Sequence, residues 1–440
     1  MFRRRLPNIT RRVFLNIVLG LFISKMLPNK YRERVWADIS PPKPLGVSDD
    51  GFSHIFVARG GSPEENMNNV LALMGGIRSL IGSDDVVIVK PNSQWWNQGM
   101  TNTNTIKEFI RQILEMREFK GEVIIADNHQ YQEDESRGWT TNSPNGDFNF
   151  NQLIEYFRKR GFKNVSKYHW HCAGRNKGLV QGDSYGNAVV RGPEEGDGYV
   201  WRSDLVYKAE SGRKAMMSYP VFTSHYSGIT IDLKHGAWKG GRYLSRKIKL
   251  INFPGLNHHS RWAGVTCCIK NYLGIVDMSC GYHGEAPKGF FNFHHIGNRN
   301  MKLHPHLIRM MKFLSIGYLN HFHGGPVGFF MKSVRMADLN VVTANWVGYG
   351  SRTDPSFSAK TNTVLACKDP VALDYYASKY ILMSVTPKTA RDEDGHLLRS
   401  INDPDNRKGP FRWCLEECHR EGIGNLEEWK MKIHEYKSKA

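Results

Sequence analysis

The chain contains no Cys-x-x-Cys pair, the local signature of ferredoxin-type clusters and thioredoxin-type redox sites. Its cysteines number seven, so they cannot all pair with one another in disulfide bonds. Two of them, Cys414 and Cys418, lie four residues apart in a segment with a helical pattern, where they would share one face as buried thiols. The sequence therefore encodes no local iron–sulfur cluster. The identity of any cofactor stays open, with a divalent metal as one candidate.

Long apolar runs are also missing. The apolar run at residues 13–23 is 11 residues long, includes Asn16 and is soon followed by Lys25. A membrane-spanning helix needs about 20 apolar residues. A stable transmembrane anchor is therefore disfavoured.

The residues around this run have the layout of a twin-arginine export signal. Arg11 and Arg12 precede Phe14 and Leu15 at the start of the apolar stretch. We expect the twin-arginine machinery to export the protein in folded form, to a periplasmic or other extracytoplasmic location. No clean small-x-small cleavage site follows, so cleavage and retention as a membrane tether both stay open.

Acidic residues are few relative to basic ones. The formal net charge is +18; the first 34 residues, with nine Lys/Arg and one Glu, supply +8 and leave +10 for the rest. This balance favours small anionic ligands, acidic polymers or lipid headgroups as partners. The chain has no nucleic-acid-binding module, which disfavours nucleic acid. A basic surface that keeps the protein soluble near an anionic envelope is the alternative.

Short apolar runs alternate with helical patterns along much of the chain. Ser62 and Glu65 have the spacing of a capping box, and Asp369-Pro370 is typical of a capped helix start. This alternation predicts an α/β protein with mostly parallel sheets built from βαβ units. The strand patterns lie at residues 54–58, 86–89, 122–126, 219–233, 247–253, 339–342 and 363–367.

The domain organisation follows from these patterns. We expect a signal over residues 1–34, a linker over 35–52, an α/β domain over 53–425 and a charged tail over 426–440. Within the domain, residues 53–165 and 336–425 would form one lobe. The irregular, Gly-, His- and aromatic-rich residues 166–335 would form the second lobe, with a cleft between the two.

Polar residues follow two predicted strands at their carboxyl ends. Lys90 and Asn92 end the strand at 86–89, Asp127 ends the next strand, and Thr101 lies in the intervening loop. Ligands of open α/β sheets bind outside the carboxyl ends of the strands. A lysine there could neutralise an anion, and an aspartate could hold a metal or accept a proton. Loop turns and a helix cap are the structural alternative.

Two further clusters contain residues that could carry chemistry. Lys270 lies between apolar residues, so it must reach water or meet an anion, while Asn271 could simply end a helix. Asp369 and Asp374 lie at the start of the helix predicted after the strand at 363–367, where Asp369 also suits a cap. Weaker candidates are the Trp95-Trp96 pair and the histidines, whose His-x-His pairs could hold a metal on a strand. Seven of those histidines fall close together, at positions 283, 294, 295, 304, 306, 321 and 323.

Four of these segments together resemble a family of bacterial and archaeal proteins, domain of unknown function 362, over roughly residues 53–425. The segments, in the order of the family, are Lys90-Pro91-Asn92 with its strand, Ala126-Asp127, Ile269-Lys270-Asn271-Tyr272-Leu273-Gly274, and Asp369-Pro370-Val371-Ala372-Leu373-Asp374. The histidine that precedes the Lys-Asn segment in the family looks most like His259, with His258 as a rival. The chain departs from the family in lacking a ferredoxin-type module and in having Thr343 where the family often has Asp.

The resemblance and the clusters imply an enzyme acting on a small anionic substrate. His259 would carry the proton, because the pKa of histidine lies near neutrality. The alternatives are a non-catalytic envelope protein that binds anionic polymers, and a redox accessory that borrows its cofactor from a partner. The expected site comprises His259, Asp127 and Lys270 as catalytic residues, Lys90, Asn92, Asn271 and Thr101 as substrate-binding residues, and Asp369 and Asp374 as metal ligands.

Overall fold

The computed structural model describes residues 42–93, 98–128, 139, 146–170, 188–209, 212–277, 289–291, 293, 296, 324–392 and 395–438. The elements below all lie in one compact unit, Pro44–Ala440. The expected mixed α/β fold with a largely parallel sheet is confirmed, whereas the division of this unit into two lobes is not confirmed.

A large sheet runs through the unit in the order β16-β1-β15-β14-β11-β2-β3-β4. Every neighbouring pair on this path is parallel except the two that involve β15. Two short strands, β12 (Gly255–Ser260) and β13 (Gly264–Thr266), extend it beside β14. The path strands are β1 (Ser53–Arg59), β2 (Val86–Pro91), β3 (Glu122–Asp127), β4 (Val165–His169), β11 (Ile248–Phe253), β14 (Leu339–Gly348), β15 (Ser358–Cys367) and β16 (Met431–Lys437).

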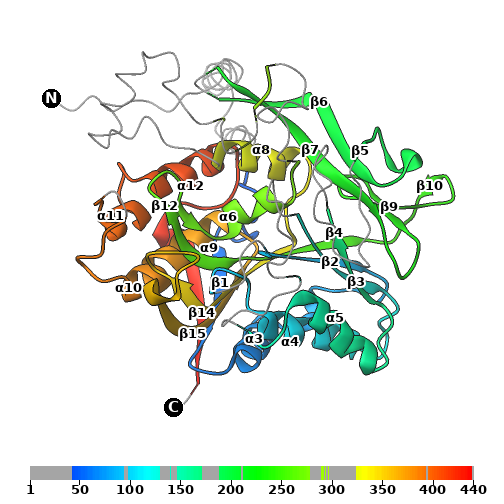
Figure 1. The fold of residues 1–440 in the computed structure, drawn as a ribbon, viewed down its shortest axis with the longest axis horizontal. Helices are drawn as coiled ribbons and strands as arrows, with labels where there is room; N and C mark the ends of the chain where they lie inside the picture. The colour runs from blue at the N-terminus through cyan, green and yellow to red at the C-terminus, as the bar shows by residue number, and fades with distance from the viewer. Residues whose placement is uncertain are drawn as a thin grey trace, which may run out of the picture. The chain divides into compact units, whose positions relative to one another are not determined.

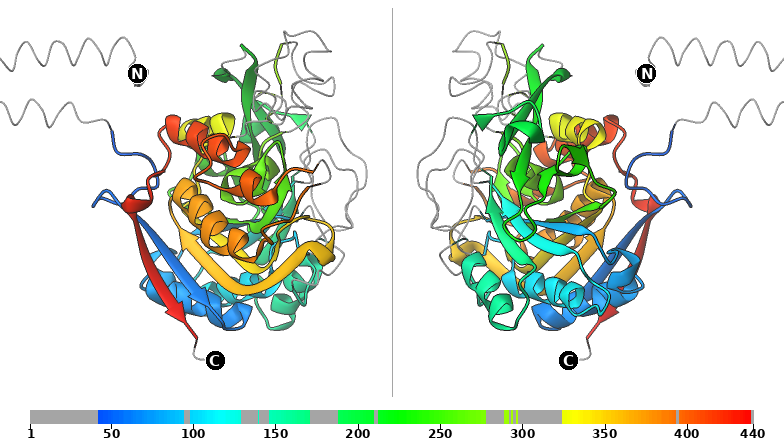
Figure 2. Two further views of the ribbon diagram at one scale, coloured as in Figure 1. Left: turned by 90° about the vertical axis from the view of Figure 1, so that its left-hand side faces the viewer. Right: turned by 90° about the vertical axis from the view of Figure 1, so that its right-hand side faces the viewer.

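Helices cover both faces of this sheet, as Figures 1 and 2 show. The cover on one face is α3 (Pro63–Leu73), α4 (Thr103–Leu114) and α5 (Phe150–Lys159); on the other it is α6 (Cys268–Asn271), α8 (Gly324–Ser333), α9 (Pro370–Ala377) and α12 (Pro410–Arg420). Successive residues of β2 alternate between the two cores: Val86 and Ile88 face one, Val87 and Val89 the other. Burial on both faces explains the continuous apolar run in the sequence.

Capping residues set where the helices begin. Ser62 and Glu65 form the predicted capping box at the start of α3. The cap of α4 is Asn102, whose side chain accepts from the Thr105 amide at 2.9 Å. Short helical segments complete the C-terminal part: α10 (Met383–Val385) and α11 (Leu398–Asn402).

A second sheet occupies much of the expected irregular middle, in the order β10-β9-β8-β7-β6-β5. Its strands are β5 (Ala188–Val189), β6 (Gly198–Lys208), β7 (Lys214–Thr223), β8 (Thr230–Asp232), β9 (Gly236–Lys239) and β10 (Arg242–Tyr243). The strand expected at 219–233 is instead the antiparallel pair β7–β8, which turns at Gly228. Its apolar residues join the same core as α6 and α9.

Both ends of the described chain pair with other segments of the protein. Strand β16 lies in the expected charged tail and pairs in parallel with β1, and Figure 2 shows the two strands side by side. In the expected linker, Leu45 forms a bridge with Ile423. The part of the chain that the structure describes holds no helix suited to crossing a membrane.

Candidate functional site

The one-turn helix α6 lies where most of the predicted site residues meet. Asp374 of α9 holds its start, because its two carboxylate oxygens accept from the backbone amides of Cys268 at 2.7 Å and Ile269 at 3.0 Å. Burial raises the pKa of Asp374 to about 6. The predicted metal ligand thus fixes α6 in place from a neighbouring helix.

Lys90 and Asp127 form a buried ion pair at the carboxyl ends of β2 and β3. The Lys90 Nζ atom lies 2.8 Å from Asp127 Oδ1 and also donates to Asn271 Oδ1 at 2.9 Å and to its neighbouring carbonyl, Pro91 O, at 2.8 Å. Burial lowers the pKa of Lys90 and raises that of Asp127, against the mutual attraction of the two charges. The three ammonium hydrogens therefore already have three acceptors.

The carboxylate of Asp127 likewise has a donor at each of its acceptor sites. Its Oδ2 accepts from the amide and the hydroxyl of Ser93 at 2.9 and 2.6 Å, and its Oδ1 accepts from the Asn128 amide at 2.9 Å in addition to Lys90. A carboxylate offers about four acceptor sites. Both groups are therefore fully engaged with neighbouring protein atoms. Direct contact with a substrate stays a prediction that would require these bonds to rearrange.

The Lys-Asn segment ends at Gly274, where the ion pair leaves no room for a side chain. A Cβ added there would lie 2.2 Å from Asp127 Oδ1 and 2.3 Å from Lys90 Nζ. Any side chain would displace the ion pair. The close approach also allows Gly274 O to accept from the Asn128 amide at 3.0 Å.

A chain of asparagines extends from the ion pair across the sheet. Asn271 Nδ2 donates to Asn252 Oδ1 at 2.7 Å, and Asn252 Nδ2 donates to Asn340 Oδ1 at 2.9 Å. Asn340 Nδ2 then donates to the carbonyl oxygens of Cys367 and Lys368. All three asparagines are buried. Sequence reasoning missed Asn252 and Asn340, although each is a polar residue next to apolar residues in a strand and so required a hydrogen-bond partner once buried.

Lys270, which lies on the same helix, belongs to a second group of side chains that also includes Arg352 and His259. It is buried, and its pKa is lowered to about 7, first by burial and then by the positive charge of Arg352. Arg352, which follows the carboxyl end of β14, donates to His259 O at 2.6 Å, and its Nη1 lies 3.2 Å from His259 Nδ1. The rival His258 is buried, with its Nδ1 3.0 Å from Asn402 Oδ1. Arg352 was not predicted, because nothing in the loop sequence distinguishes it from other surface arginines.

Asn92 and Thr101 close the loop that follows β2. The Asn92 amide donates to Thr101 Oγ1 at 2.7 Å, and that hydroxyl donates to Phe253 O at 2.5 Å. Asn92 Nδ2 lies 3.3 Å from Gly99 O. These contacts tie the loop, and with it two of the four predicted substrate-binding residues, to the end of β11.

Asp369 is placed as a helix cap. It accepts from the amides of Val371 at 2.8 Å, Ala372 at 3.0 Å and Asn425 at 2.6 Å, and from Ser53 Oγ at 2.5 Å. Four donors occupy its carboxylate, and burial raises its pKa. These contacts therefore fit a helix cap better than the predicted role of Asp369 as a metal ligand.

The structure groups Asp374 with two cysteines instead of with Asp369. One ligand atom each from Cys267, Cys268 and Asp374 lies within 4.8 Å of the others, and all three residues are buried. Burial raises the pKa of the Cys267 thiol to about 12. The predicted His-x-His pair at His169 cannot be compared, since His171, the seven clustered histidines, Trp95 and Trp96 lie outside the described residues, as does the twin-arginine segment.

A pocket of about 450 Å³ opens at the carboxyl edge between α3 and α4. It contains none of the predicted site residues. Its most distinctive member is Asn345, whose buried Nδ2 has no hydrogen-bond partner among the described residues. The lining residues are Gly60, Gly61, Ser62, Pro63, Asn102, Asn104, Gly146, Asp147, Asn345, Trp346, Lys360 and Asn362.

The fold and these contacts define an α/β protein whose buried polar residues meet beneath the carboxyl edge of a mainly parallel sheet. Residues 229–379, about a third of the chain, match the family model described as Domain of unknown function (DUF362). The matched segment contains His259, Lys270 and Asp374, whereas Lys90 and Asp127 precede it. The expected resemblance is confirmed for this segment. No curated protein and no solved structure shows significant similarity to the chain.

Proposed function

We propose that this protein is an enzyme that binds a small anionic substrate at the carboxyl edge of the large sheet. Arg352 and His259 would hold the negative group, and Lys270 would accept or donate the proton. The observation that carries this proposal is the contact of Arg352 with His259, together with the effect of the Arg352 charge on the pKa of the buried Lys270. Ligands of open α/β sheets bind at this edge.

The position of Lys270 suits proton transfer. A lysine with a pKa of about 7 is close to half deprotonated at neutral pH, and a catalytic base works best with a pKa near the working pH. An anionic substrate would add a negative charge beside Arg352 and Lys270. That charge would favour the protonated amine, so binding and proton uptake would be coupled.

The contacts around α6 would hold Lys270 in a fixed position. Asp374 fixes the start of α6, and Asn271 fixes its end through Lys90 and Asn252. A catalytic side chain must be held by neighbours that are themselves locked. The ion pair of Lys90 and Asp127 would thus contribute by positioning α6.

Competitive labelling with acetic anhydride tests this proposal, because only the deprotonated amine reacts. We expect Lys270 to titrate near pH 7 and to be protected by inorganic sulfate, phosphate or a small dicarboxylate. Arg352→Gln should remove that protection. Arg407→Gln, a matched change at an exposed arginine, should preserve it. Labelling of Lys270 that no anion alters would refute the proposed site.

One observation also favours a divalent metal, at Cys267, Cys268 and Asp374. The two Sγ atoms lie 3.9 Å apart. Tetrahedral zinc with Zn–S bonds of about 2.3 Å requires roughly 3.8 Å between its sulfurs. The donor set therefore fits zinc, whose charge would favour the thiolate forms that burial disfavours. Elemental analysis should find zinc in the natively purified protein and lose it in Cys268→Ser; zinc-free protein would end this idea.

A further inference from the structure

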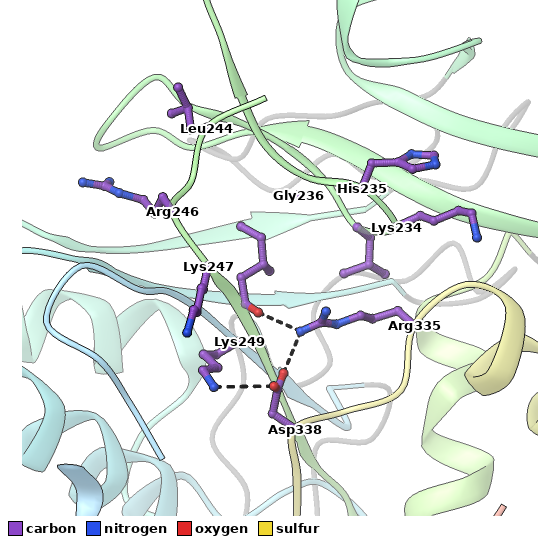
Figure 3. Close-up of a pocket in the computed structure, with 11 residues that line it drawn as sticks. Lys234, His235, Gly236, Leu244, Arg246, Lys247, Lys249, Arg335 and Asp338 are labelled. Atoms are coloured by element: carbon purple, nitrogen blue, oxygen red, sulfur yellow. Dashed lines mark hydrogen bonds and ion pairs between the residues drawn. The ribbon is translucent and has the colours of Figure 1, made fainter. Parts of the chain in front are cut away.

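A second pocket, of about 310 Å³, lies at the opposite, amino end of β11. Figure 3 shows the turn before β9 above the start of β11, with Arg335 and Asp338 beside them. Six of the lining residues are basic and one is acidic. The lining comprises Leu233, Lys234, His235, Gly236, Leu244, Arg246, Lys247, Ile248, Lys249, Arg335 and Asp338.

The backbone of β11 fixes the floor of this pocket. Arg335 Nη2 donates to Ile248 O and to Asp338 Oδ2, both at 2.7 Å. Asp338 is held in turn by Leu250, whose amide donates to Asp338 Oδ2 at 2.9 Å and whose carbonyl accepts from the Asp338 amide at 2.8 Å. The buried Arg335 Nε has no hydrogen-bond partner among the described residues. A rigidly placed guanidinium therefore retains an unused donor.

Positive charge exceeds negative charge around this floor. Lys249 Nζ lies 3.7 Å from Asp338 Oδ1, so that carboxylate is shared between a lysine and Arg335. Lys247 is exposed, and in the described structure its side chain forms no ion pair or hydrogen bond. Arg246 is paired with Asp84 outside the lining set. The pocket can therefore accept an anion without first breaking its existing pairs.

The turn before β9 supplies one further cation, Lys234, and the imidazole of His235. Lys234 Nζ donates to Ser333 O, and burial together with the charge of Arg202 lowers the pKa of Lys234. His235 Nδ1 lies 3.0 Å from Asp232 Oδ2, an arrangement that leaves Nε2 directed elsewhere. An anion in the pocket would stabilise the positive charge of Lys234.

We propose that this pocket binds the phosphate group of a small ligand, at a site separate from the one around Lys270. A phosphate carries up to two charges and has several acceptor oxygens, which match a guanidinium donor together with lysine ammonium groups. A carboxylate would leave more of this positive charge unmatched. The volume suits a small ligand or a single headgroup, at the low end of the range for ligand pockets.

Isothermal titration calorimetry of the purified full-length protein with inorganic pyrophosphate tests the proposal. We expect binding that weakens as salt is raised. Lys247→Ala should reduce the affinity about tenfold, the loss of one charge-assisted contact. Lys408→Ala, an equal change of charge at an exposed lysine outside the lining, should leave the affinity unchanged.

Three outcomes would overturn the proposal. Pyrophosphate could fail to bind at millimolar concentration, or Lys247→Ala could bind as tightly as Lys408→Ala. The affinity could also depend on Arg352→Gln and not on Lys247→Ala, which would assign the anion to the proposed catalytic site. Vesicles of phosphatidylglycerol distinguish the source of the phosphate. Binding to vesicles in place of pyrophosphate would refute a soluble ligand.

Discussion

The burial of Lys270 has a measurable effect on stability. Its pKa is about 7 in the folded protein, against an ordinary value of 10.5. The unfolded chain therefore binds more protons than the folded chain between these values. Since the unfolded state holds the extra proton, the free energy of unfolding rises with pH across this window.

The size of the effect follows from the difference in pKa. Each pH unit corresponds to about 1.4 kcal/mol, so Lys270 lowers the stability at pH 7 by up to about 4 kcal/mol relative to pH 10.5. Lys270→Met keeps a side chain of similar length and removes the titrating group. The variant should be more stable than the native protein at pH 7, and this advantage should shrink as the pH rises toward 10.

Urea unfolding at a series of pH values, from 6.5 to 9.5 in steps of about half a unit, provides the assay. The quantity to compare is the difference in unfolding free energy between the native protein and Lys270→Met, because other titrating groups cancel in it. This difference should fall by about 1.4 kcal/mol per pH unit above pH 7. If the unfolding free energies of the two proteins changed with pH in parallel, the pKa of Lys270 would not be lowered in the folded protein. That result would also refute its proposed role in proton transfer.

Three further changes test other parts of the structure. Asp127→Asn leaves a buried ammonium without its counter-charge and should destabilise the protein by about 3 to 5 kcal/mol in urea unfolding. Gly274→Ala places a methyl group against the same ion pair and should cost at least about 2 kcal/mol by the same measurement. Replacing Arg11 and Arg12 together by lysine should abolish export, as followed by cell fractionation in a host with the twin-arginine machinery.

Each of these changes has a contrary result. A loss below about 1 kcal/mol for Asp127→Asn would mean that the ion pair is not buried in solution. Wild-type stability in Gly274→Ala would show that the helix and the ion pair are farther apart than the structure places them. Unchanged fractionation of the double lysine variant would assign the basic segment to another role.

Local residue patterns were sufficient for most of the elements. The capping box at Ser62, the continuous apolar run of β2 and the Asp369-Pro370 helix start each depend on neighbours within a few positions. The hairpin at 219–233 was missed because its turn, Ser224–Gly228, lacks the strong Asn-Gly or Asp-Gly signature. The pairing of β16 with β1 joins residues far apart in the chain, so no local pattern could reveal it.

The site shows the same division. The sequence identified four residues of this region as candidates but did not reveal their contacts. These residues are Lys90, Asp127, Lys270 and Asn271. An ammonium group at a strand end can face a ligand or a neighbouring carboxylate, and only the fold puts Asp127 Oδ1 2.8 Å from Lys90 Nζ. Arg352 acquires its importance solely from its distance to His259.

The sequence by itself determined the α/β class, the order of most strands and helices, and the excess of positive charge, because these depend on composition and on periods of a few residues. Tertiary structure alone decided which charges are neutralised. The fold brings Lys90 to a carboxylate, the charge of Arg352 near enough to Lys270 to lower its pKa, and Lys234 and Arg335 to the amino end of β11. The strength of a charge depends on its distance from other charges and on its exclusion from water, and both are properties of the folded chain.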